Sequence, residues 1–274
     1  MGPEPEKLTL FQLIARSDLV ALVKVRDGSL RYAMVDLVEV LKGQAPATQL
    51  RIAFRDFNFS RAPNEDVIVF PMGQQEILFL VPYKIPRKKK DIEKFKDLFT
   101  LNHGREGRIT LPAEGSEVVL DSVRKLAEIS RMDAASQVEA FFGLLSAPNL
   151  PLVQASLSEI ERLRAADSEI LGQLAAFLAS PSPGLKAQSL RVIAQVFGSR
   201  STSEDTDVDA VRSALAAVLE RARNDPDETV RIQAVAAIAA WPRRLDVEGD
   251  LRAIAGTDQA QAVRYEAEKA LFKR

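Results

Sequence analysis

The sequence predicts a chain of two unlike parts, a small β-barrel followed by a solenoid of paired helices. Three observations lead to this fold class. Residues 18–55 and 74–112 hold short apolar and alternating runs between turn residues, which is typical of strands. Beyond about residue 132, Ala and Leu recur at spacings of three and four, which is typical of helices. One nine-residue helical pattern then occurs four times. We expect a barrel domain over 8–131 and a repeat domain over 132–274.

Six segments of the first part have the composition and length of strands. They are "DLVALVKV" (18–25), "LRYAMVDLVEVLKG" (30–43), "TQLRIAF" (48–54), "QQEILFLVPYKI" (74–85), "KDLFTLN" (96–102) and "GRITLP" (107–112). Five or more strands joined by short turns favour a small barrel or a sandwich. Short helices are expected before and after them, over 8–17 and 116–130.

Three of these segments together resemble the netrin-like domain, the OB-type barrel that also occurs in tissue inhibitors of metalloproteinases and in bacterial relatives. The matching points are Asp18 before the first strand, Leu41-Lys42-Gly43 at the end of the second, and the "G-x-x-x-I-L-F-L" pattern of 73–80. The resemblance implies an OB-like barrel. The inhibitors act through an N-terminal cysteine and disulfides, and this chain has no cysteine. Protease inhibition by that mechanism is therefore not implied.

The second part contains eight predicted helices, and every second one shares a register. The helices are expected near 133–146, 150–164, 167–179, 184–197, 207–223, 228–241, 246–255 and 260–273. The shared segments are "LVQASLSEI" (152–160), "LKAQSLRVI" (185–193), "VRIQAVAAI" (230–238) and "VRYEAEKAL" (263–271). In each, the first residue is apolar, the fifth is small and the ninth is Ile or Leu, which places these three on one helical face. Asn149, Ser182 and Asp227 precede three of the copies as N-cap residues.

The copies begin 33, 45 and 33 residues apart, which is the period of stacked helical pairs. The pattern of Asp227, Val230, Arg231 and Ala234 resembles the second helix of a HEAT repeat in its short form. The resemblance implies four HEAT-like repeats whose second helices line one face. An irregular alanine-rich bundle is the alternative fold.

Basic residues occupy the second register position in three copies, as Lys186, Arg231 and Arg264. They are candidates for partner binding on the second-helix face. In HEAT arrays such residues usually make structural contacts with acidic residues of adjacent repeats, and this is the interpretation that we favour over contact with a partner. We expect a non-enzymatic interaction protein that binds a protein partner through the repeat surface and the attached barrel.

A second functional hypothesis is single-stranded nucleic-acid binding by the OB-like barrel. Lys88, Lys89 and Lys90 would contact phosphates, and Phe54, Phe57 and Phe59 would stack on bases. The interpretation that we favour is a solvated hairpin loop for the lysines and core packing for the phenylalanines. The 20 basic and 18 acidic residues up to Ser130 give no strongly basic half, so nucleic acid is not the expected partner.

Several kinds of chemistry lack their residues in this sequence. His103 is the sole histidine, so a catalytic triad or a cysteine-free zinc site would depend on it alone, and we interpret it as a loop residue beside Gly104. Phosphate-binding glycine motifs are absent. "DTDVD" (205–209) begins like a calcium loop, but Ala210 and Ala216 replace the required Gly and Glu. Helix capping by Thr206 with Asp209 accounts better for this segment. We predict no cofactor and no metal.

The sequence leaves compartment and oligomeric state open. Cysteine-free chains suit the cytosol and the periplasm alike. No run approaches 18 apolar residues, so the chain is expected to be soluble, without membrane insertion. The opening "MGPEPEKL" has no apolar signal core, and it is compatible with a start that replaces a removed signal peptide.

Overall fold

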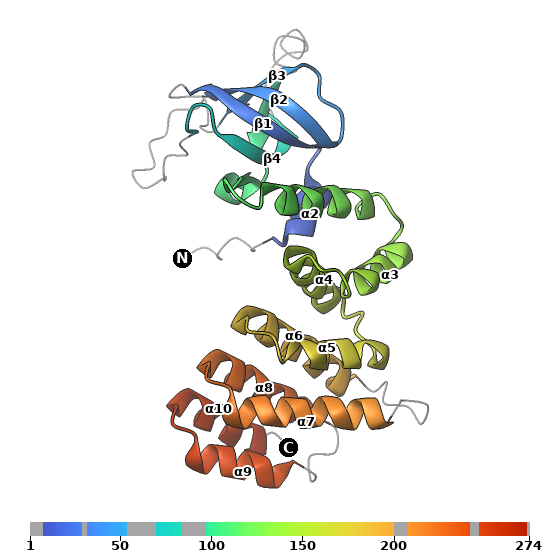
Figure 1. Ribbon diagram of the computed structural model, residues 1–274, viewed down its shortest axis with the longest axis vertical. Coiled ribbons are helices and arrows are strands. Elements are labelled where there is room, and N and C mark those ends of the chain that lie inside the picture. The colour runs from blue at the N-terminus through green and yellow to red at the C-terminus, as the bar shows by residue number, and fades with distance from the viewer. Residues whose placement is uncertain are drawn as a thin grey trace. The chain divides into compact units, whose positions relative to one another are not determined.

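The computed structural model describes residues 8–28, 32–53, 70–83, 97–199, 208–241 and 247–272 (Figure 1). The chain divides into two compact units, residues 1–133 and 134–274. Among the described residues, the first contains the strands and two α-helices, and the second contains helices without strands. Within the described part of the chain, no helix combines the length and apolar character needed to cross a membrane.

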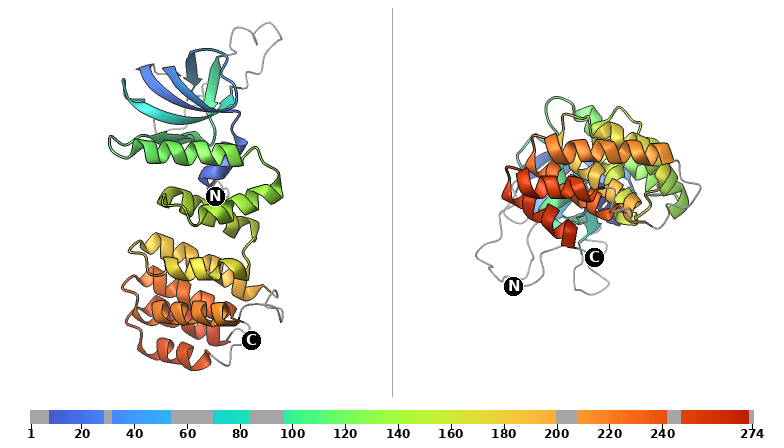
Figure 2. Two further views of the ribbon diagram at one scale, coloured as in Figure 1. Left: turned by 45° about the vertical axis from the view of Figure 1, so that its right-hand side comes forward. Right: turned by 90° about the horizontal axis from the view of Figure 1, so that it is seen from below.

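The strands of the first unit close into a five-stranded barrel. Its elements are β1 (Leu19–Gly28), β2 (Tyr32–Lys42), β3 (Gln49–Ala53), β4 (Gln75–Pro82) and β5 (Leu98–Leu101), with the short β6 (Arg108–Thr110) beside β4. β1 pairs with β2 and with β4, β2 pairs with β3, and β5 lies between β3 and β4, so the ring is complete (Figure 2). The β3–β5 pairing is parallel and the other pairings are antiparallel. The expected OB-like barrel is therefore confirmed, and the sandwich is not formed.

Alternation along the strands fills the barrel. The inward side chains form one apolar cluster that draws on all five barrel strands, including Val23, Val35, Ile52, Leu78 and Leu101. β4 is buried on both faces, because Ile77 and Phe79 on its other side are also fully buried. This explains why its sequence reads as a continuous apolar run rather than as a clean alternation.

The end of β2 is fastened to the helix α1 (Leu10–Arg16) that precedes the barrel. The Lys42 ammonium donates to three carbonyls at the end of α1, those of Ile14 (2.7 Å), Ala15 (2.9 Å) and Ser17 (2.9 Å). A cation there satisfies carbonyls that the helix leaves without intrahelical partners. Gly43 follows with φ of +83°, and a Cβ at this position would lie 2.0 Å from the Asp18 carbonyl oxygen. Only glycine fits this crossing of the chain.

Helix α2 (Ser116–Ile129) follows the strands and belongs to the same unit. Its buried side includes Leu120, Val123 and Leu126. Arg124 forms a two-pronged ion pair with Glu39 of β2, at 2.9 and 2.7 Å. The predicted helices at 8–17 and 116–130 are thus both present.

The second unit consists of four helical pairs (Figure 1). The pairs are α3 (Ala134–Leu144) with α4 (Leu150–Leu163), α5 (Leu171–Phe177) with α6 (Pro183–Gly198), α7 (Val208–Asn224) with α8 (Glu228–Ala240), and α9 (Glu248–Thr257) with α10 (Gln261–Phe272). The second helices contact one another in the order α4, α6, α8, α10. The four HEAT-like repeats expected from the register are therefore present, and the irregular bundle is not.

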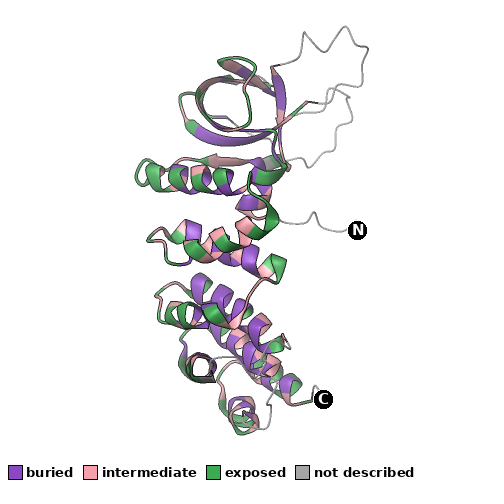
Figure 3. Cartoon of the chain, turned by 90° about the vertical axis from the view of Figure 1, so that its right-hand side faces the viewer, coloured by how far each residue is buried: buried purple, intermediate pink, exposed green. Residues whose placement is uncertain are grey.

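The features that define the register have the expected structural roles. The side chains of Asn149, Ser182 and Asp227 each accept a hydrogen bond from the third backbone N–H of the following helix. At the fifth register position, Ser156, Ser189, Ala234 and Ala267 are all fully buried. Figure 3 shows that buried residues, in purple, alternate with exposed ones along the repeat helices, so that each helix has a buried and an exposed side. Small residues at this position allow the helices to approach closely.

Some predicted features fall outside the described residues. They are the basic run with Lys88, Lys89 and Lys90, the phenylalanines Phe54, Phe57 and Phe59, and the proposed N-cap Thr206. The hypothesis of nucleic-acid binding by the barrel depends on these lysines and phenylalanines, so it stays a prediction.

Candidate interaction surface of the helical repeats

Two of the three basic residues at the second register position, Lys186 and Arg231, each meet an acidic residue from the turn of the next repeat. The Lys186 ammonium of α6 lies 2.8 Å from a carboxylate oxygen of Asp225, which stands in the turn between α7 and α8. Both side chains are buried, at 9% and 0% exposure. Burial alone would raise the pKa of Asp225, but the hydrogen bonds from Lys186 and from the Asp227 N–H hold that pKa below its usual range.

The same arrangement occurs one repeat later, with better geometry. The Arg231 guanidinium of α8 donates through Nε (2.9 Å) and Nη2 (3.2 Å) to the two carboxylate oxygens of Asp258, in the turn before α10. Its Nη1 donates to the carbonyls of Asp225 (2.9 Å) and Pro226 (3.4 Å). Arg231 therefore joins the turn of its own repeat to the turn of the next one. A buried guanidinium with this many acceptors is fixed in orientation.

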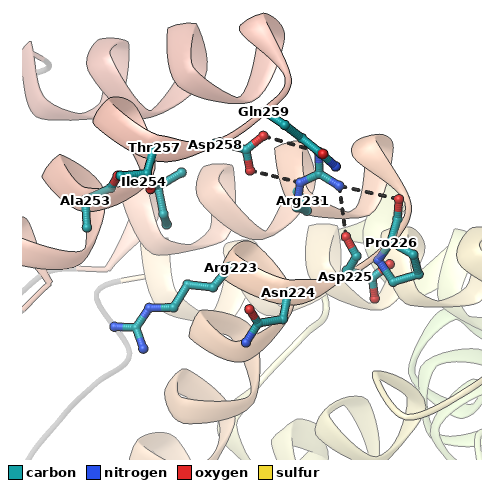
Figure 4. Close-up of a pocket in the computed structure, with 10 residues that line it drawn as sticks. All are labelled: Arg223, Asn224, Asp225, Pro226, Arg231, Ala253, Ile254, Thr257, Asp258 and Gln259. Atoms are coloured by element: carbon teal, nitrogen blue, oxygen red, sulfur yellow. Dashed lines mark hydrogen bonds and ion pairs between the residues drawn. The ribbon is translucent and has the colours of Figure 1, made fainter.

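Arg264 of α10 repeats half of this pattern. Its Nη1 donates to the carbonyls of Asp258 (2.6 Å) and Gln259 (3.3 Å), as Arg231 does to its own turn. Lys186, Asp225, Arg231, Asp258 and Arg264 thus form one continuous series of contacts across three repeats, here called the charge ladder. Figure 4 shows its central part, with Arg231 between the turn of Asp225 and Pro226 on one side and Asp258 on the other.

A polar pocket of about 510 Å³ opens beside the charge ladder, between the α7–α8 turn and the α9 end of the next repeat (Figure 4). Its lining includes Arg223, Asn224, Thr257 and Gln259. Arg223 forms an ion pair with Asp250, and the Thr257 hydroxyl donates to the Ala253 carbonyl at 2.8 Å. The lining therefore offers polar contacts from both repeats.

The structure therefore places the three described candidates of the sequence in one series of contacts. Lys186 and Arg231 are buried in ion pairs with adjacent repeats, and Arg264 is half-buried. Asp225 and Asp258 were not predicted from the sequence, because both lie outside the nine-residue register. Each stands five residues before the start of a register copy, and that shared offset is a signal that the sequence does contain.

The solvent side of the second helices changes character along the array. On α4 the third, seventh and tenth register positions are the polar Gln154, Ser158 and Glu161, and on α6 they are Ala187, Arg191 and Ala194. On α8 the equivalent positions are apolar and half-buried, as Ile232, Ala236 and Ala239. On the neighbouring α10 the third register position is Tyr265, which is 64% exposed. We call Ile232, Ala236, Ala239 and Tyr265 the apolar strip.

The barrel contains a buried acidic group that was not predicted from the sequence. Glu76 of β4 is fully buried on the inward side of the strand, two residues before Leu78, and Arg108 Nη1 lies 3.5 Å from its carboxylate. Burial raises the pKa of Glu76, and the charge of Arg108 limits the rise. The Arg108 guanidinium also lies 5.1 Å from the ring centre of Phe70.

His103, considered above as a possible catalytic or zinc-binding residue, lies beside the acidic Glu106. His103 has a left-handed backbone with φ of 64°, directly before the short 3-10 helix Gly104–Gly107, and its Nε2 lies 3.6 Å from a carboxylate oxygen of Glu106. Among the described residues, no three His, Cys, Asp or Glu side chains are grouped as metal ligands would be.

Comparison with known proteins gives similarity to solved structures only. No family model matches the chain, and no curated protein matches it. A designed armadillo repeat protein in complex with the peptide (KR)4 is 15% identical, with 58% of this chain and 76% of that chain covered and a TM-score of 0.44. Computationally designed armadillo repeat proteins for modular peptide recognition are 18% identical, with coverage of 59% and 78% and a TM-score of 0.43.

Proposed function

We propose that this chain is a non-enzymatic interaction protein that binds a protein partner through the second-helix face of its repeats. The observation that supports this most is the apolar strip on α8 and α10. Ordinary surface helices carry polar residues on their solvent side, as α4 does here with Gln154, Ser158 and Glu161. Half-buried apolar side chains on one helix beside an exposed aromatic ring on the next, as in this strip, are typical of protein-binding surfaces.

The charge ladder supports the same proposal indirectly. It fixes repeats three and four relative to each other through Arg231 and Asp258, so the strip is carried by a rigid pair of helices. A preformed surface binds with a smaller loss of conformational freedom than one that must be ordered.

The test is a pull-down from lysate of the source organism with the full chain as bait. The variants Tyr265→Ser and Ala236→Lys alter the strip at exposed or half-exposed positions, so the fold should be retained. Met72→Ser is the matched control, because Met72 is 75% exposed on the barrel unit. A partner that is retained by the parent and by the control, but lost with both strip variants, is expected. Retention that is equal for all four baits would contradict binding through this surface.

We further propose that the barrel is of the netrin-like type. The support comes from the residues that carry the sequence resemblance. Lys42 closes the end of α1, Gly43 lies against the Asp18 carbonyl, and the apolar run of β4 is buried on both faces. These residues hold the first helix to the barrel, and the proposal assigns them a structural role and no inhibitory one.

A further inference from the structure

The short strand β6 closes part of the barrel wall. One edge of β4 pairs with β1 along residues 75–80. The other edge is shared, because β5 pairs with residues 80–82 of β4 and β6 pairs with residues 76–78. β6 therefore covers the part of β4 that β5 does not reach. Since a strand this short adds few hydrogen bonds, it is the part of the wall that can open locally at the lowest free energy.

Glu76 lies on the inward side of β4, at the part of the wall that β6 covers. Its direct neighbours across the sheet are Val23 of β1 and Thr110 of β6. The Glu76 side chain is fully buried, and neither of its carboxylate oxygens accepts a hydrogen bond of normal geometry from a described residue. A carboxyl group in such a place costs far less free energy when it is neutral than when it is ionised.

Arg108 of β6 is the charged group that faces Glu76 among the described residues. Its Nη1 lies 3.5 Å from the carboxylate, and its side chain is partly exposed. The charged Lys24 of β1 is exposed on the outer face of its strand, and Glu106, which precedes β6, is also exposed. Burial raises the pKa of Glu76, and the charge of Arg108 and the nearby Thr110 hydroxyl offset only part of that rise.

We propose that β6 is a latch on the barrel wall, which opens more readily when Glu76 loses its proton. With Glu76 neutral, the closed wall buries only a carboxylic acid. With Glu76 ionised, opening gives the carboxylate access to water, and this gain exceeds the loss of the Arg108 contact because the net effect of the closed wall is to disfavour the charge. Opening also leaves backbone groups of β4 without partners, so the open wall offers an edge on which another strand can pair.

The direction of the pH dependence follows from the two states of the latch. In the open state the Glu76 carboxyl has an ordinary pKa, and in the closed state its pKa is raised. The equilibrium constant for opening is therefore constant below the ordinary pKa. It increases as the pH rises from the ordinary to the raised pKa, and it levels off above the raised one.

The test is hydrogen exchange of the full chain between about pH 4 and pH 8, with each rate divided by the intrinsic rate at that pH to give the opening constant. The Leu111 N–H reports on the latch, since it donates to the Gln75 carbonyl of β4 at 3.3 Å. The Leu37 N–H, which donates to the Thr48 carbonyl at 2.8 Å, reports on the β2–β3 side of the barrel.

Three variants identify the group responsible. Glu76→Gln keeps the size of the side chain and removes its charge. Glu106→Gln is the matched control, because it makes the same change at an exposed carboxylate just before β6. Arg108→Met removes the charge that favours the ionised form of Glu76.

The opening constant at Leu111 should rise with pH, by up to about tenfold per pH unit where one proton is released, and the constant at Leu37 should change much less. Glu76→Gln should hold the Leu111 constant near the low-pH value of the parent, Glu106→Gln should leave the profile unchanged, and Arg108→Met should extend the rise to higher pH. A parent constant that does not change with pH, or a pH dependence that survives Glu76→Gln, would overturn the inference. Equal changes at Leu111 and Leu37 would also overturn it, because the whole barrel would then be opening. If Arg108→Met does not fold, the comparison of Glu76→Gln with Glu106→Gln decides.

Discussion

Removal of the Asp258 carboxylate should lower the free energy of unfolding far more than removal of an exposed ion pair between the same two repeats. In Asp258→Ala, Arg231 loses the acceptors of Nε and Nη2 while it stays buried, with a side chain only 4% exposed. Loss of one partner of a buried ion pair typically costs about 3–5 kcal/mol. The Asp258 side chain also accepts from the Ala260 N–H at 2.8 Å, so a local backbone contact is lost as well.

The structure places the expected loss near the lower end of that range. Nη1 of Arg231 keeps the carbonyls of Asp225 and Pro226 in the variant. The adjoining pocket of about 510 Å³ also gives water a route to the guanidinium. We therefore expect a decrease of about 3 kcal/mol in the free energy of unfolding.

Asp250→Ala is the matched control, because Asp250 pairs with Arg223 across the same two repeats. The Arg223 side chain is 49% exposed, and pairs of this kind contribute at most about 1 kcal/mol. Urea unfolding followed by circular dichroism gives the global loss. Hydrogen exchange in α9 and α10 shows whether the last repeat opens alone, as stacked repeats can. If Asp258→Ala and Asp250→Ala differ by less than about 1 kcal/mol, the ladder is not the main connection between these repeats.

Three further predictions concern single residues of the two units, each checked by urea unfolding. Gly43→Ala should destabilise the barrel by several kcal/mol, because the new Cβ would collide with the Asp18 carbonyl. Gly73→Ala is the control: Gly73 has nearly the same φ, but nothing lies within 4 Å of the new Cβ, so the loss should be only about 1 kcal/mol. Similar losses in the two variants would refute the explanation by close approach. Ser189→Ala should stabilise by about 1 kcal/mol, because the buried Ser189 hydroxyl has no hydrogen-bond partner among the described residues, and a loss would count against this. Glu76→Gln should stabilise the protein at pH 7 and have little effect below about pH 4. The pKa of Glu76 is higher in the folded than in the unfolded chain, so the free energy of unfolding of the parent falls as the pH rises through that pKa. A stability difference between Glu76→Gln and the parent that does not depend on pH would exclude the Glu76 carboxyl as its cause.

Local patterns in the sequence predicted most of the architecture. Strand segments and helices were found because burial imposes periods of two and 3.6 on the side chains, and caps such as Asn149 and Ser182 mark helix starts. The order in which the strands pair to close the barrel could not be derived from the sequence. The parallel pairing of Ile52 with Phe99 joins segments almost fifty residues apart, and no local pattern encodes such a pairing. Glu76 was missed for a related reason, because a single Glu in an apolar strand does not reveal which face it occupies.

The charge ladder shows how non-local information was nevertheless present in the sequence. Five residues before each register copy stand Ala147, Ser180, Asp225 and Asp258. The last three have the same local role, since each side chain accepts from the backbone N–H two residues on. The second register positions are Val153, Lys186, Arg231 and Arg264.

The second register position of each repeat matches in charge the residue that stands five positions before the next register copy. Val153 precedes Ser180 and neither is charged, Lys186 precedes Asp225, and Arg231 precedes Asp258. Between the described repeats, a basic residue thus stands at the second register position only where the turn of the next repeat has a carboxylate. This is expected if a buried basic residue is tolerated only together with its acidic partner. Arg264 has the cation of this series without a following carboxylate among the described residues. Arg264 is only half-buried, unlike Lys186 and Arg231, so this rule does not require an ion-pair partner for it.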